Sequence, residues 1–179
     1  DVLLLDPALV YPSALSVNVA VTLENVALMT GRATVDTAMP RFMDGLTVNA
    51  SDVHLLGLEI KRGDPLTDIV VLNGANPTLD GCRVLGDKLH GAKRGIAGNA
   101  PNVTVIRCYV ADCFGTYPGN DTQAFAAWNS PGPFRLVDSY FSGGSETILF
   151  GGADPVDAAH VPAHITITGC TITKDPAWQ

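Results

Sequence analysis

Five polar residues in the second half of this 179-residue chain have side chains suited to acid–base chemistry or to ion binding. They are Lys93, Arg94, Asp121, Gln123 and Glu146. Cationic side chains stabilise developing negative charge, carboxylates exchange protons, and an amide can hold its neighbours in place. Lys93, Gln123 and Glu146 fall at one position of a sequence repeat, with Arg94 and Asp121 nearby, so the repeat predicts that the three side chains form a row.

Several interpretations of this row are open. An ammonium, an amide and a carboxylate together would bind an acidic sugar. In β-elimination from a uronic acid, Lys93 or Arg94 would remove the proton beside the carboxylate or stabilise the enolate. Asp121 and Glu146 would form an acid–base pair for glycoside hydrolysis if their carboxyl groups lie roughly 5 to 9.5 Å apart. The row would instead be structural if Lys93 and Glu146 neutralise the bases of the loops and Gln123 bridges them.

The repeat that aligns these residues consists of six short apolar stretches. The stretches are 22–28, 54–60, 78–84, 104–110, 135–141 and 166–172. In each stretch the second and the last residues are apolar, and a turn-type or polar residue lies between them. The motif recurs every 24 to 32 residues, which indicates stacked units that each need a neighbour to bury their apolar side. The pattern predicts an all-β solenoid.

A column of asparagines predicts where the coils turn. Asn49, Asn73 and Asn99 each stand eight residues before the turn residue of their coil, while in the fifth coil the interval from Asn129 to Asp138 is nine. Asn tolerates left-handed backbone conformations and bonds within its own turn. Amides stacked on successive coils are therefore predicted to bond to one another along the axis. The other side of the coil carries loops of variable length, where function on a regular scaffold usually lies.

The cysteines also follow the repeat. Cys82, Cys108 and Cys170 occupy one position, and Ser139 fills it in the intervening coil. This pattern predicts an interior stack of small side chains. Parallel strands lie about 4.8 Å apart, whereas a disulfide needs Cβ atoms about 3.8 Å apart, so we expect no bridge. No second Cys or His stands at ligand spacing, and neither a metal nor another cofactor is predicted.

Composition excludes some classes of partner. A net charge of −7 with few basic clusters argues against nucleic acid. No apolar run reaches the roughly 18 residues that cross a bilayer, so no membrane span is predicted. We expect residues 1–179 to form a single β-helix domain that is a fragment of a longer chain. Trp128, directly before an asparagine turn, is expected in the core.

The repeat, the asparagine turns and the coil length resemble the right-handed parallel β-helix of the pectate-lyase-like superfamily, from about residue 15 onward. The second half is also similar to a group of bacterial and phage-encoded β-helix proteins of poorly defined function. The segments that carry this second likeness are 93–96, 121–124, 128–134, 146–155 and 174–178. The resemblance implies a right-handed, single-stranded parallel β-helix of about six coils. It also implies binding or cleavage of acidic polysaccharides beside one sheet, or a role in phage tail spikes and adhesins. The catalytic signatures of calcium-dependent pectate lyases and of polygalacturonases are absent.

Three functions are compatible with these observations. The first is a rigid extracellular or virion-associated module that binds a polysaccharide or surface glycan. The second is a purely structural segment of a phage fibre, spike or decoration protein. The third is a polysaccharide lyase or glycoside hydrolase that acts on an acidic polysaccharide through Lys93, Gln123 and Glu146. A homo-oligomer or a larger assembly is expected, because the open ends of a solenoid need caps or partner chains.

Overall fold

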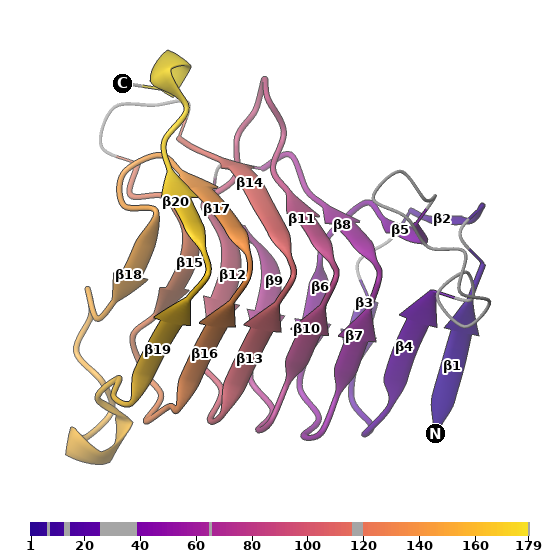
Figure 1. Cartoon of the computed structure of the whole chain (residues 1–179), viewed down its shortest axis with the longest axis horizontal. Helices are drawn as coiled ribbons and strands as arrows, with labels where there is room; N and C mark the ends of the chain where they lie inside the picture. Colours follow the sequence, from indigo (N-terminus) through magenta and orange to yellow (C-terminus); the bar gives the residue numbers. More distant parts are fainter. Residues whose placement is uncertain (7, 13–14, 26–38, 65, 116–119, 179) are drawn as a thin grey trace.

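In the computed structural model the chain folds as a right-handed parallel β-helix of about six coils (Figure 1). The structure describes residues 1–6, 8–12, 15–25, 39–64, 66–115 and 120–178. Each complete coil contributes one strand to each of three parallel sheets, here named A, B and C. The chain order A, B, C repeats along the axis, so strands far apart in sequence lie side by side.

The strands of each sheet have well-defined bounds. Sheet A contains β1 Val2–Leu5, β4 Thr22–Asn25, β7 His54–Leu56, β10 Thr78–Asp80, β13 Val103–Ile106, β16 Phe134–Val137 and β19 Ile165–Thr168. Sheet B contains β2 Val10–Tyr11, β5 Arg41–Phe42, β8 Glu59–Lys61, β11 Arg83–Leu85, β14 Tyr109–Cys113, β17 Tyr140–Gly143 and β20 Thr171–Thr173. Sheet C contains β3 Leu15–Val17, β6 Leu46–Val48, β9 Asp68–Leu72, β12 Arg94–Gly98, β15 Gln123–Ala127 and β18 Ile148–Phe150. Two 3₁₀ helices, η1 Ala158–His160 and η2 Pro176–Trp178, complete the described elements.

The apolar stretches lie in register in sheet A, which confirms the predicted repeat. Thr78 pairs with His54 on one side and with Thr104 on the other. The next residue of each strand points into the coil, and Leu55 and Leu79 are almost completely buried. Residues 26–28 of the first stretch lie outside the described part of the chain.

The turn between sheets A and B has a left-handed backbone in five successive coils. Its residues are Gly57, Gly81, Arg107, Asp138 and Gly169, with φ angles of 66°, 62°, 52°, 47° and 67°. This conformation suits glycine, because a side chain costs energy there. The column of turn-type residues in the sequence therefore marks a real backbone requirement.

The cysteine position follows directly after this turn, and its predicted stacking is confirmed. The thiols of Cys82 and Cys108 are buried and donate to the carbonyls of Leu55 and Leu79 in the preceding coil, with sulfur–oxygen distances of 3.3 and 3.5 Å. All four cysteines are free thiols. The cysteines of the column therefore link their coils to the preceding ones through S–H donors instead of disulfides.

The predicted asparagine ladder is present in the first coils. Asn49 Nδ2 donates to Asn18 Oδ1, and Asn73 Nδ2 donates to Asn49 Oδ1, both at 2.9 Å. The pattern changes at Asn99, whose Oδ1 instead accepts the backbone N–H groups of Trp128 and Asn129 at 2.9 and 3.0 Å. The fifth coil thus turns differently from the coils before it.

A second ladder, which the sequence analysis missed, runs three residues further along the chain. Asn76 Nδ2 donates to Asp52 Oδ1 at 2.8 Å, and Asn102 Nδ2 donates to Asn76 Oδ1 at 3.0 Å. All three residues have φ near 58°. Their constant offset of three from Asn49, Asn73 and Asn99 was the signal in the sequence.

The core fills the space between the three sheets. Phe125, Phe134 and Phe150 pack as a cluster of rings with centroids 5.1 to 6.3 Å apart. Burial falls at the terminal coils, where Leu3 is 53% and Ile167 is 41% exposed. Among the described residues, no helix is long and apolar enough to cross a membrane.

Candidate functional site

Sheet C brings four polar side chains into line where its strands begin. Asp68, Arg94 and Gln123 are the first residues of β9, β12 and β15, and they pair in register. Phe125 pairs with Ile148, which places Gln123 level with Glu146 in the next coil. We call Asp68, Arg94, Gln123 and Glu146 the sheet C row. Neighbouring members stand one strand spacing apart, roughly 4.8 Å.

Lys93 does not belong to this row, contrary to the alignment made from the sequence. Arg94 is the residue level with Gln123. That alignment matched Asn129 with Asn99, but Ala126 pairs with Ala97, so Trp128 is the residue level with Asn99. The turn of the fifth coil holds extra residues, and counting back from Asn129 therefore displaced the row by one position.

Gln123 is the centre of the row and is fully buried. Its Nε2 donates to Asp121 Oδ1 at 2.8 Å and to Glu146 Oε2 at 3.0 Å. Its Oε1 accepts from Arg94 Nε at 3.2 Å. These contacts agree with the bridging role that the structural interpretation gave to Gln123. Because both carboxylate oxygens contact one nitrogen, they lie at most about 5.8 Å apart.

The hydrogen bonding between β15 and the next coil is irregular directly after Gln123. The N–H groups of Ala124 and Phe125 both donate to the Thr147 carbonyl, at 3.0 and 3.2 Å. Gln123 pairs with Arg94 and Phe125 pairs with Ile96, so no residue is inserted here and the irregularity is confined to the hydrogen bonds. Gln123 contacts Asp121 and Glu146, while Phe125 is buried in the core.

Arg94 is held on three sides. Its Nη1 lies 3.2 Å from Asp68 Oδ1, its Nε donates to Gln123, and its Cζ lies 4.5 Å from the centre of the Trp128 ring. Trp128 is half-buried, so its expected place in the core was wrong. It stands at the displaced turn of the fifth coil and covers the guanidinium, a cation–π contact.

A groove of about 310 Å³ adjoins the sheet C row on the side of the earlier coils. Its charged lining consists of Asp44, Arg62, Asp68, Lys93 and Arg94. We call it the basic groove, because three cations face two carboxylates there. Lys93, although outside the row, thus lines a cavity together with Arg94. Among the described residues, the Lys93 ammonium has no hydrogen-bond or ion-pair partner.

Two buried polar atoms of the basic groove also have no hydrogen-bond partner: Arg62 Nε and Thr67 Oγ1. The nearest carboxylate oxygen to Arg62 Nε, Asp44 Oδ1, lies 3.7 Å away, beyond hydrogen-bonding distance. A buried donor without an acceptor costs about 1–3 kcal/mol. An acidic ligand in the groove would supply acceptors to both atoms. Sequence analysis did not select Arg62 or Thr67, because they lie on a loop outside the repeat.

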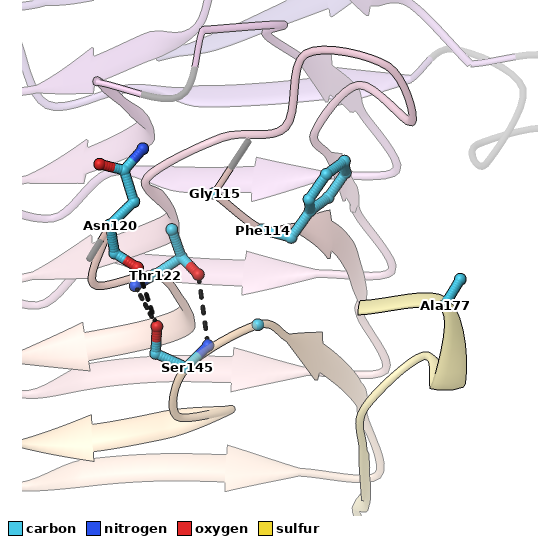
Figure 2. Close-up of a pocket in the computed structure, with 7 residues that line it drawn as sticks. Phe114, Gly115, Asn120, Thr122, Ser145 and Ala177 are labelled. Carbon is cyan, nitrogen blue, oxygen red and sulfur yellow. Dashed lines mark hydrogen bonds between the residues drawn. The ribbon is translucent and has the colours of Figure 1, made fainter. Parts of the chain in front are cut away.

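A second cavity, of about 570 Å³, lies beside the later coils, and the described residues that line it are uncharged (Figure 2). Thr122 and Ser145 face each other across one side, where Ser145 N–H donates to Thr122 Oγ1 at 3.3 Å and Ser145 Oγ donates to the Asn120 carbonyl at 3.0 Å. Phe114 lies opposite them. Asn120 Nδ2 is buried without an acceptor. We call this cavity the neutral hollow.

Within the described part of the chain, no group of three His, Cys, Asp or Glu side chains is placed to hold a metal ion. Comparison with known proteins finds no matching family model, no matching curated protein and no matching solved structure. The function must therefore be inferred from the geometry of the site.

Proposed function

We propose that this chain is a rigid β-helix module that binds an acidic glycan in the basic groove, outside the cell or on a virion. The observation that carries the proposal is the pair of buried, unpartnered atoms, Arg62 Nε and Thr67 Oγ1, in a groove that also holds the free Lys93 ammonium. A carboxylate or sulfate has the charge and the acceptors for these three groups. The resemblance to pectate-lyase-like β-helices, which bind acidic polysaccharides beside one sheet, also supports the binding of an acidic glycan.

Binding to acidic oligosaccharides tests this proposal. Lys93→Met should weaken the binding of an acidic oligosaccharide by about 10- to 100-fold, because a charge-assisted hydrogen bond contributes about 1.5–3 kcal/mol. Isothermal titration calorimetry at low and at physiological salt measures the effect, and added salt should weaken wild-type binding. Lys88→Met is the matched control, since Lys88 is exposed and lies outside the groove lining.

Two results would contradict the proposal. One is a folded wild-type protein that binds no acidic oligosaccharide. The other is equal weakening by Lys93→Met and Lys88→Met, which would mean that only net charge matters.

Glycoside hydrolysis is the second candidate, and one observation favours it. The Asp121 and Glu146 oxygens lie at most about 5.8 Å apart, an upper limit that is compatible with the roughly 5–5.5 Å of retaining glycosidases. Against it, both carboxylates share one amide donor, and Arg94 is already held by Asp68, Gln123 and Trp128. Assays of the same oligosaccharides for new reducing ends and for unsaturated uronates separate hydrolysis, elimination and binding alone. The absence of product from every substrate would contradict both the hydrolase and the lyase hypothesis.

We also propose that the module works within a homo-oligomer or a larger assembly. The terminal coils expose apolar side chains, including Leu3 and Ile167, and their edge strands have unpaired backbone groups. Sedimentation velocity over a range of concentrations tests this point, and a monomer at all concentrations would contradict self-association.

A further inference from the structure

We infer that the glycan bound at the basic groove is a heteropolymer in which acidic sugars alternate with neutral ones, and not a continuous polyuronate. This inference rests on the proposed function. It is carried by a change of charge along sheet C, from the basic groove to the carboxylates of the later coils.

The cations of the basic groove can neutralise one negative charge of a ligand. Arg62, Lys93 and Arg94 face the carboxylates of Asp44 and Asp68. Asp64 also lies 3.9 Å from Arg62 Nη2, so among the described residues the Lys93 ammonium is the cation without a carboxylate partner, and a single acidic group neutralises it. Arg94 is already paired with Asp68 at 3.2 Å, and Arg62 lies within 4 Å of Asp44 and Asp64, so Lys93 is the cation available to a ligand and Arg62 offers it only the unpartnered Nε.

The sign of the charge is reversed one to two coils further along the axis. Asp121 and Glu146 are exposed and share the single donor Gln123 Nε2. Lys174 is the nearby cation, and its Nζ donates to the Ser145 carbonyl instead of to a carboxylate. Glu146 stands two strand spacings from Arg94, roughly 10 Å. A glycan that extends along sheet C from the basic groove therefore meets two carboxylates that repel a second acidic sugar.

The neutral hollow is suited to an uncharged sugar next to the acidic one. It adjoins the row, because Thr122 and Ser145 directly precede Gln123 and Glu146 in the chain. The described residues of its lining carry no charge. An uncharged sugar placed there would bring no negative charge to Asp121 or Glu146. The two cavities thus select an acidic unit next to a neutral unit.

Three oligosaccharides of equal length test the inference by calorimetry. A hyaluronan hexasaccharide alternates uronate with N-acetylhexosamine, hexagalacturonate carries a carboxylate on every sugar, and chitohexaose is neutral. We expect the hyaluronan fragment to bind at least about tenfold more tightly than hexagalacturonate, although it has half the charge, and chitohexaose to bind most weakly. The double variant Asp121→Asn/Glu146→Gln should reduce the ratio between the two acidic ligands several-fold.

The outcomes separate this inference from the proposed function. If hexagalacturonate binds as tightly as the hyaluronan fragment, or if the double variant leaves their ratio unchanged, the inference is overturned while acidic-glycan binding stands. If chitohexaose binds as tightly as the hyaluronan fragment, an acidic group is not required and both fail. If the folded wild-type protein binds neither acidic ligand, the proposed function itself fails. Circular dichroism of each variant reports whether the fold is retained.

Discussion

At the scale of single residues, burial controls the chemistry of the thiols. Cys113 is 0% exposed, and its Sγ donates to the Ala111 carbonyl at 3.4 Å. Burial raises the pKa of the Cys113 thiol well above its ordinary value, and burial together with the neighbouring Cys82 raises the pKa of Cys108. A thiol in such a site is inert, because the thiolate is the nucleophile. Neither residue is therefore a candidate for the chemistry of the sheet C face.

The same burial predicts a loss of stability at alkaline pH. An unfolded chain ionises its thiols near pH 8.5, while the folded protein keeps Cys113 protonated. Its stabilising contribution is therefore complete below that pH and falls as the pH rises, by roughly 1 kcal/mol per pH unit. Urea denaturation between about pH 8.5 and pH 10.5 measures the slope, and Cys113→Ala should reduce it by one such contribution.

The matched control is Val110→Ala. Val110 is also fully buried on β14 but carries no titratable proton. This variant should lower stability equally at all these pH values. A Cys113→Ala protein with the wild-type slope would show that this thiol does not titrate between the folded and unfolded states as argued.

At the scale of the elements, the left-handed turn between sheets A and B determines how each coil closes. Gly81 has φ of +62°, and a Cβ added there would have no neighbour within 4 Å. Gly81→Ala should therefore cost about 1–2 kcal/mol from backbone conformation alone. Asp138→Gly, at the same turn with φ of 47°, should stabilise by up to about 1 kcal/mol. Urea denaturation of both variants measures the two changes, and a loss of stability in both would contradict the argument.

The strands of sheet A were predictable because each stretch repeats the same apolar positions on a backbone of constant geometry. His54, Thr78 and Thr104 pair as the alignment required. The cysteine stack and the first part of the asparagine ladder follow from the same constant offset. Such features depend only on equivalent residues in successive coils, so a repeat in the sequence is sufficient to locate them.

The candidate site was predicted only in part, because it lies where the repeat is broken. Gln123 and Glu146 were correctly placed next to each other, but Arg94 replaces Lys93 in the row. The nine-residue interval in the fifth coil shows that residues are inserted, but not on which side of Asn129 they lie. The N–H groups of Ala124 and Phe125 both donate to the Thr147 carbonyl of the next coil, and no local pattern encodes this arrangement.

Two residues of the basic groove, Arg62 and Thr67, were not predictable from the repeat. Arg62 and Thr67 belong to the loop between β8 and β9, where chain length varies from coil to coil. Their position beside Lys93 results from the stacking of two loops of different length. The scaffold is regular and the loops are irregular. The fold can therefore be predicted from the sequence, whereas half of the proposed binding site cannot.

At the scale of the whole molecule, each coil is stabilised by the coils on either side of it, so stability should depend on position along the axis. Leu79 and Ile167 occupy the same position in sheet A, but Leu79 is 0% and Ile167 is 41% exposed. Leu79→Ala should cost about 2–5 kcal/mol, because it leaves a cavity between two packed coils. Ile167→Ala should cost about 1 kcal/mol or less, since much of that side chain already contacts water.

Urea denaturation of the two variants measures this gradient, and hydrogen exchange of the wild-type protein reports it without mutation. Amides of β10 and β13 should exchange through global unfolding, and those of β19 through local opening of the last coil. Equal costs for the two substitutions, with equal protection of β10 and β19, would mean that the terminal coil is as well packed as the middle. In that case its exposed apolar side chains must be covered in solution, which would favour the assembly proposed above over an isolated module.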